Sequence, residues 1–171
     1  NAAGENFRCG GGGHIIDDPG SGYALGRDAL AAALQTEDGR LSENALHGAV
    51  MDTVGGSGIQ GIFDFVYFSR RGKGDIAALA PLVLRCAAQG DAVSLDILRR
   101  GAAELARLVS AVMGKLGLEN GSPCALAGGL LAEDNVYRRA VCAALAPFCR
   151  PAAPEHDALF GAVQLALAAI Q

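Results

Sequence analysis

Four consecutive glycines at residues 10–13, followed by Asp17 and Asp18, form the part of the sequence best suited to contact a ligand. Consecutive glycines allow a ligand to lie directly on the backbone. A carboxylate beside exposed backbone groups accepts hydrogen bonds from hydroxyls, and Ser21 adds a donor and an acceptor at a helix start. This combination suits a neutral polyol. The other interpretation makes the glycines a hinge, Asp18 a turn residue and Ser21 a helix N-cap.

Gly128 and Gly129 form a second candidate site, because a short apolar run precedes them and a helical pattern follows. The run at residues 123–127 lies between glycines and predicts a buried strand of a parallel sheet. A strand, a turn and a helix in this order bring backbone and the helix N-terminus toward a ligand. The alternative is a tight turn that binds nothing.

The remaining chemistry-bearing residues favour structural roles. Residues 56–61 match the letters G-x-G-x-x-G, but a helical pattern precedes them where a dinucleotide site needs a strand, so they predict a helix–helix connection. His14 has no catalytic partner visible in the sequence. The five cysteines show no C-x-x-C spacing, so we expect reduced, buried thiols rather than disulfides or a metal site.

The composition indicates one domain spanning residues 1–171, with a core built from Ala, Leu, Val and Ile. Hydrophobic residues make up 51% of the chain and aromatic residues only 5%. The net charge of −4 argues against nucleic-acid binding, which requires a cationic surface. No apolar run approaches the ~20 residues of a membrane span, and the N-terminus does not look like a signal peptide. We therefore expect a cytoplasmic protein with neither nucleic acid nor membrane as a partner.

Apolar residues recur mostly at intervals of three and four, which predicts a helix-rich α/β fold with a small sheet. The longest predicted helix, residues 92–116, would form the spine of the domain. Ser42 is expected to cap the second helix, and Pro81 to kink the fourth or start a new one. The other expected elements are the end of a β-hairpin at residues 4–9, helices near 20–39, 42–54, 59–67, 75–89 and 134–145, a short strand at 148–150, and a last helix at 158–170 with its apolar residues inward.

The first glycine block, read together with the residues after it, resembles a family signature. Residues 10–14, Asp18 and residues 20–23 are similar to G-G-W-G-H-x-x-G-D-E-G-S-x-Y, which is typical of N-acetylglucosamine kinases and the related BadF/BadG/BcrA/BcrD-type ATPases. Further family landmarks follow in the family's order at residues 76–81, 88–91, 126–129 and 161–167. The resemblance implies the sugar kinase–Hsp70–actin superfamily, whose lobes have ribonuclease-H-like folds.

The resemblance also implies roles for individual residues. Gly11 and Asp18 would border the sugar, with Asp18 accepting hydrogen bonds from its hydroxyls, while His14 and Ser21 would support that loop. The nucleotide side would be formed by two glycines that lie against the adenosine part of ATP, namely Gly128 and Gly129. The sequence departs from the signature where the family has Trp, Gly and Glu, at Gly12, Asp17 and Pro19.

The implied reaction transfers the γ-phosphoryl group of ATP to an amino-sugar hydroxyl, with Mg²⁺ offsetting charge. In such kinases the catalytic Asp and both phosphate-binding loops precede the glycine block, and none of these motifs occurs here. We therefore expect residues 1–171 to be the C-terminal lobe alone, with the N-terminal lobe absent, no catalytic residue in this chain and no activity of the 171 residues by themselves.

Two other functions, and the oligomeric state, stay open on the sequence. One alternative is the same lobe of an activator ATPase that drives electron transfer to a reductase or dehydratase. The other is a non-catalytic sugar-sensing domain. A homodimer is compatible with each of these functions.

Overall fold

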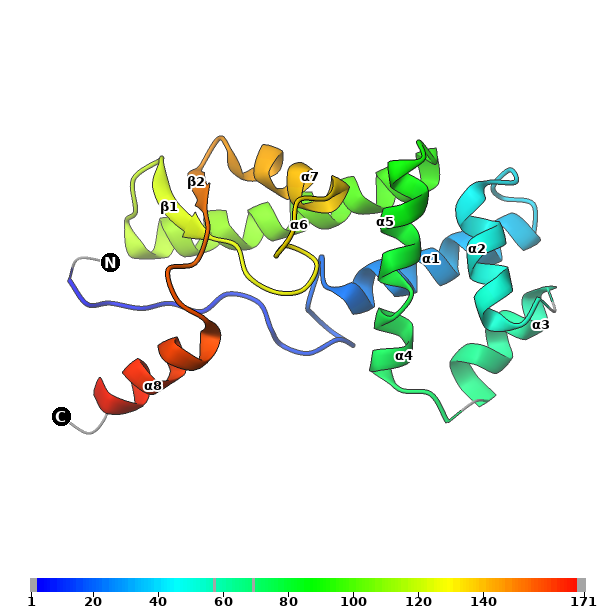
Figure 1. Ribbon diagram of the computed structural model, residues 1–171, viewed down its shortest axis with the longest axis horizontal. Coiled ribbons are helices and arrows are strands. Elements are labelled where there is room, and N and C mark those ends of the chain that lie inside the picture. Colours follow the sequence, from blue (N-terminus) through cyan, green and yellow to red (C-terminus); the bar gives the residue numbers. More distant parts are fainter. Residues whose placement is uncertain (1–2, 57, 69, 169–171) are drawn as a thin grey trace.

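The computed structural model describes residues 3–56, 58–68 and 70–168, and helices dominate it (Figure 1). The elements in chain order, of which η1 is a single π-helical turn, are α1 (Gly22–Glu37), α2 (Ala45–Val54), α3 (Gly58–Phe63), η1 (Asp64–Phe68), α4 (Lys73–Ala77), α5 (Ala80–Ala88), α6 (Ala92–Leu116), β1 (Ser122–Ala125), α7 (Val136–Leu145), β2 (Cys149–Ala152) and α8 (Ala158–Ala168). This order confirms a helix-rich α/β chain with a small sheet.

Helix α6 runs along much of the length of the molecule, and α7 packs against it (Figure 1). Asp91 caps its start by accepting a hydrogen bond from the Ser94 amide at 2.7 Å. The helix ends at Gly117, whose φ of 61° is a left-handed conformation that glycine adopts without strain. Both ends agree with the prediction. Its inward side includes buried residues along its length, namely Ile97, Leu98, Ala102, Ala106 and Met113.

Helices α1 to α5 pack together beside the N-terminal part of α6 (Figure 1). Asn44 rather than Ser42 caps α2, because the Asn44 side chain accepts a hydrogen bond from the His47 amide at 2.9 Å. Pro81 lies in the first turn of α5, a position where its missing N–H costs no helix hydrogen bond. It therefore starts a new helix, which decides between the two expectations for this residue.

The glycine-rich segment that matches G-x-G-x-x-G begins in the connection between two helices, as predicted, and continues into the second of them. Helix α2 ends at Val54 and α3 begins at Gly58. Gly55, at the end of α2, has a φ of 107°, and its amide donates to the carbonyl of Met51. Ser57 lies outside the described residues.

The described sheet consists of two parallel strands, β1 and β2, joined by a crossover through α7. Their register pairs Ser122 with Cys149 and Ala125 with Ala152. Strand β1 begins and ends slightly earlier than predicted. Beyond it, the amide of Leu126 still donates to the carbonyl of Ala152 at 3.1 Å, so the chain remains tied to the sheet before the glycine turn.

The prediction of a hairpin end at residues 4–9 is wrong. The segment forms no strand, because no described strand runs beside it to pair with its backbone. It instead passes along the molecule toward the glycine block, which rests on α6. An added Cβ on Gly10 would lie 3.0 Å from Cδ1 of Leu108.

The prediction that α8 buries an apolar face is also wrong for the described residues. Leu159 is 71% exposed, Val163 49% and Leu167 52%, because no other described element packs closely against this helix. Figure 1 shows α8 extending away from the rest of the chain. Ile170, which was expected on the same face, lies outside the described residues.

None of the described helices alone combines the length and the apolar character needed to cross a bilayer. Only the pair formed by residues Lys73–Ala88 and Ala92–Leu116 reaches these values together, and that pair is bent by 118°.

Candidate functional site

A cavity of about 410 Å³ lies where the loop before α1, the middle of α6 and the loop after β1 meet. Figure 1 shows the loop between β1 and α7 curling toward the start of α1. Five of the six residues predicted to contact ligands line this cavity, namely Gly11, Asp18, Ser21, Gly128 and Gly129. The fold therefore brings together two segments that the sequence places more than a hundred residues apart.

Asp18 has an unusual backbone for a residue that is not glycine. Its φ of 60° makes it the one non-glycine residue with a positive φ among the described residues. Asp tolerates this left-handed conformation better than most residues, although the conformation still carries strain. Its side chain is half-buried at the cavity, and no described residue donates a hydrogen bond to its carboxylate. The carboxylate is thus an acceptor at the cavity to which none of the described residues donates.

Ser21 acts as the N-cap of α1. Its Oγ accepts a hydrogen bond from the Ala24 amide at 3.2 Å, and its own amide donates to the Asp18 carbonyl at 3.3 Å. The interpretation of Ser21 as a helix N-cap is therefore confirmed. Since Ser21 also lines the cavity, it joins the loop that carries Asp18 to a rigid helix start.

Residues 10–17 form a closed loop rather than an open hinge. Arg8 donates to the Gly11 carbonyl at 2.8 Å, the Gly12 amide donates to the Asp17 carboxylate at 2.9 Å, and the Asp17 amide donates to the Gly13 carbonyl at 2.8 Å. An added Cβ on Gly12 would lie 3.0 Å from the same Asp17 carboxylate oxygen. Asp17 therefore occupies the space beside Gly12, and these are two of the positions at which the sequence departs from the family signature.

His14 does not line the cavity. Its ring packs edge-on against Tyr23 of α1, with 4.7 Å between the ring centroids. The contact joins the glycine loop to the first turn of α1, which agrees with a supporting rather than a catalytic role.

Gly128 and Gly129 contribute bare backbone to the same cavity. Gly128 has a φ of 98°, and an added Cβ on either glycine would meet nothing within 4 Å. The amide of Leu131 donates to the Gly128 carbonyl at 2.9 Å and closes the turn. Helix α7 begins at Val136, slightly later than predicted, with Asn135 as its cap. The backbone of these two glycines is therefore not covered by side chains of the described residues.

Sequence reasoning missed further lining residues, among them Leu105, Leu108 and Tyr137. Leu105 and Leu108 were assigned only to the inward face of the long helix, whereas both also line the cavity. Tyr137, which is fully buried, was not selected at all. A single Tyr in a helix otherwise rich in Ala and Val is a usable signal, because a buried Tyr hydroxyl needs a hydrogen-bond partner.

None of the cysteines lines the candidate cavity. All five are free thiols, of which Cys86 and Cys149 are buried and the other three half-buried. Burial, with the neighbouring thiols Cys124 and Cys142, raises the pKa of Cys149 to about 11. Among the described residues, no group of three or more His, Cys, Asp or Glu side chains could hold a metal ion.

Comparison with known proteins defines the class of the chain. The family model described as the BadF/BadG/BcrA/BcrD ATPase family matches residues 1–166. The chain therefore belongs to this ATPase family, as the signature around the glycine block predicted.

The relatives within this class include sugar kinases. The chain is 38% identical over 120 residues to the N-acetylmuramic acid/N-acetylglucosamine kinase of Clostridium acetobutylicum, covering 70% of this chain and 39% of that kinase. It is 29% identical over 144 residues to the N-acetyl-D-glucosamine kinase of Dictyostelium discoideum, covering 82% of this chain and 44% of that kinase. The chain thus spans less than half the length of these two relatives.

A solved structure extends the similarity to the fold. The crystal structure named "Putative N-acetylglucosamine Kinase from Chromobacterium violaceum" superposes with a TM-score of 0.75 at 31% identity. The match covers 96% of this chain and 53% of that one. The described arrangement of helices and strands is therefore shared with about half of a larger protein.

Proposed function

We propose that the chain is the C-terminal, ribonuclease-H-like lobe of an ATP-dependent kinase that phosphorylates an N-acetylhexosamine such as N-acetylglucosamine. The observation that carries this proposal is the single cavity lined by both the Asp18 loop and the Gly128 turn. Two relatives are named as amino-sugar kinases, and each is more than twice the length of the matched region. A cavity that forms one side of a binding cleft, with a second lobe forming the other side, agrees with the lining of the cavity and with the length of these relatives.

On the sugar side, Asp18 is the recognition group. Its carboxylate has no donor among the described residues and is half-buried, so a sugar hydroxyl can supply the missing hydrogen bond. Gly11 contributes backbone at the same side of the cavity, while Ser21 and His14 hold the loop through α1. The chain thereby orients the sugar hydroxyl rather than activating it.

On the nucleotide side, the bare backbone of Gly128 and Gly129 receives the adenosine part of ATP. The absence of any atom within 4 Å of an added Cβ there leaves room for a ring to lie against the peptide planes. Mg²⁺ offsets the phosphate charge in such transfers. The described residues do not form a magnesium site of their own, so we assign the metal and the catalytic Asp to the other lobe.

Phosphoryl transfer depends mainly on placing the two reactants in line and stabilising charge. In this proposal the present lobe supplies the placement, by holding sugar and nucleotide on opposite walls of one cavity. A sugar-sensing protein would use the same walls without turnover. The kinase relatives favour catalysis over sensing, and they favour it over an activator ATPase that would hold an iron–sulfur cluster.

The test is substitution of Asp18 in the complete, two-lobed protein, assayed for ATP-dependent phosphorylation of N-acetylglucosamine. Asp18→Ala should raise the sugar KM by about ten- to a hundredfold, since a charge-assisted hydrogen bond contributes roughly 1.5–3 kcal/mol. Asp18→Asn tolerates the left-handed backbone equally well and isolates the charge. Asp52→Ala on the exposed side of α2 is the matched control.

Three outcomes are informative. A raised sugar KM in Asp18→Ala with the Asp52→Ala control unchanged supports the proposal. An unchanged sugar KM removes Asp18 from the sugar site. Sugar binding without any phosphorylation by the unsubstituted protein would replace the kinase with a sensing domain.

A further inference from the structure

Tyr137 joins two distant parts of the cavity wall through one buried hydrogen bond. It lies in the first turn of α7 and is 0% exposed. Its hydroxyl donates to the carbonyl of Gly20 at 2.7 Å, across 117 positions in the sequence. Gly20 follows Asp18 by two residues, so this bond acts directly on the loop that carries the recognition carboxylate.

The contact around Gly20 leaves little freedom of movement. An added Cβ on Gly20 would lie 2.8 Å from the Tyr137 hydroxyl and 2.8 Å from the carbonyl oxygen of Gly101. An added Cβ on Gly101 would lie 2.9 Å from the same hydroxyl. The Leu105 side chain lies closer still, at 2.7 Å from the Cβ added on Gly20. The loop, α6 and α7 therefore meet at a point with no room for a side chain on Gly20, and the position of Gly20 is closely defined.

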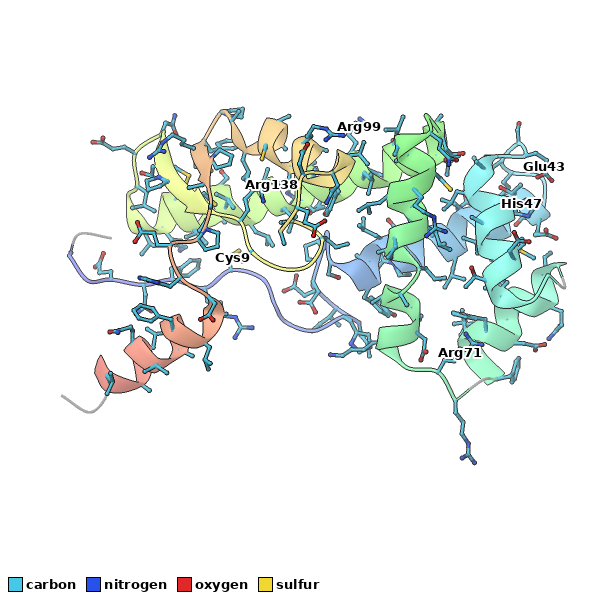
Figure 2. All side chains as sticks on the ribbon, in the orientation of Figure 1. Cys9, Glu43, His47, Arg71, Arg99 and Arg138 are labelled. Carbon is cyan, nitrogen blue, oxygen red and sulfur yellow. The ribbon has the colours of Figure 1, made fainter. Side chains whose placement is uncertain are left out.

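The same turn of α7 also holds the other side of the cavity. The side-chain amide of Asn135 donates to the Leu130 carbonyl at 2.9 Å, and the Arg138 guanidinium donates to the Leu131 carbonyl. Leu131 in turn donates its amide to Gly128 at 2.9 Å. Figure 2 labels Arg138 on this helix. One helical turn thus contacts the segment after the glycine turn and the segment after Asp18.

We propose that Tyr137 is a positioning residue that fixes the Asp18 loop relative to the Gly128 turn by holding the carbonyl of Gly20. The inference rests on the proposed kinase function and identifies how this lobe sets the distance between its sugar and nucleotide walls. Without the hydroxyl, the Gly20 carbonyl loses its partner and the Asp18 loop loses its anchor to α7. The wall formed by Gly128 keeps its own contacts to Asn135 and Arg138.

The test compares Tyr137→Phe with Tyr67→Phe in the complete kinase. Phe keeps the ring that packs in the core, and Tyr67 is 72% exposed and lies on η1, apart from the cavity. Tyr137→Phe should raise the KM for N-acetylglucosamine about tenfold while the KM for ATP and kcat change less than about twofold. A purely structural role would lower kcat by reducing the active fraction and leave both KM values unchanged.

Hydrogen exchange of the Ser21 amide in the same proteins gives a measurement that needs no turnover. This amide donates to the Asp18 carbonyl, so Tyr137→Phe should accelerate its exchange by about tenfold, with no change in Tyr67→Phe. An unchanged sugar KM in an active kinase, or unchanged exchange at Ser21, overturns the positioning role. If the unsubstituted kinase phosphorylates no amino sugar, the proposed function fails, and the exchange measurement alone decides the role of Tyr137.

Discussion

The backbone conformation of Asp18 costs stability, whereas its side chain places a carboxylate at the cavity. The left-handed φ of 60° costs energy for any residue with a Cβ, whereas glycine, which is abundant in this loop, would adopt it freely. Keeping Asp at this position places a carboxylate at the cavity at the expense of stability. Strain of this kind is concentrated at functional sites, which supports a binding role for the side chain.

A second residue-scale feature is the histidine between two carboxylates at the far end of the molecule (Figure 2). The ring nitrogens of His47 lie 2.7 Å from Glu37 and 2.9 Å from Glu43, and the His47 side chain is only 12% exposed. Burial acts to lower the pKa of His47, but the hydrogen bonds and charges of the two glutamates outweigh it and raise that pKa.

The raised pKa of His47 predicts a pH-dependent contribution to stability. Because protonation is favoured in the folded state, the stabilisation is fully present below the unfolded pKa of 6.5 and is lost as pH rises through the folded pKa. Urea unfolding between about pH 5.5 and about pH 8.5 should show the free-energy difference between wild type and His47→Gln shrinking as pH increases. A difference independent of pH would contradict this assignment.

At the scale of elements, the crossing of α1 and α4 depends on a glycine. An added Cβ on Gly26 would lie 1.9 Å from the carbonyl oxygen of Ile76 and 2.9 Å from its carbonyl carbon. These are backbone atoms, so neither can rotate away as the end of a side chain could. The two helices can approach this closely only while residue 26 has no side chain.

Gly26→Ala should therefore destabilise the chain, whereas Gly48→Ala should stabilise it. The first substitution forces α1 and α4 apart and should lower the free energy of unfolding by about 3 kcal/mol. The second places Ala in the exposed interior of α2, where an added Cβ meets nothing within 4 Å, and should raise it by roughly 0.5–1 kcal/mol. Urea unfolding of both variants measures the contrast, and equal effects would argue against the close crossing.

The elements that local sequence specifies were predicted well, and those that depend on distant partners were not. The ends of α6 follow from Asp91 and Gly117, which act within one turn of the helix. The cap of α2 was misplaced because Ser42 and Asn44 have similar capping propensities, and only the hydrogen bond to His47 distinguishes them. Periodicity also assigned an inward face to α8, although periodicity does not say which element, if any, covers that face.

In the candidate site, too, residues with a local sequence pattern were predicted and residues that depend on distant partners were not. The predicted ligand residues came from glycine spacing and from a family signature, and five of them line one cavity. Tyr137 was missed because its partner is a backbone carbonyl 117 positions away. A single Tyr in the helix can indicate a buried hydroxyl, but the local sequence does not identify the partner of that hydroxyl. His14 was included for its place in the signature and contacts Tyr23 outside the cavity.

At the scale of the whole molecule, the proposed function makes this chain one half of a two-lobed site. The described sheet has only two strands, and the cavity is lined by the loops before α1 and after β1 together with residues of α6 and α7. The relatives and the solved structure are about twice as long as the matched region. In the proposed function, the groups that move the phosphoryl group belong to the other lobe, and phosphorylation then requires both lobes.

This arrangement predicts that the 171-residue chain has no kinase activity by itself. Incubated with ATP, Mg²⁺ and N-acetylglucosamine, it should form no sugar phosphate above the uncatalysed background, whereas the two-lobed protein should show turnover. Product is measured by mass spectrometry, and circular dichroism confirms that the isolated chain is folded in the assay. Clear turnover by the isolated chain would place the catalytic groups within these residues.

The bond between Tyr137 and Gly20 also bears on the order in which the molecule folds. The capping contacts of α1, α2 and α6 each close within four residues, but this bond closes a loop of 117 positions. Contacts between distant residues form slowly because the chain between them must first be ordered. We therefore expect the helices to form early and the cavity to be completed last, so that a newly made chain becomes competent to bind ligands only at the end of folding.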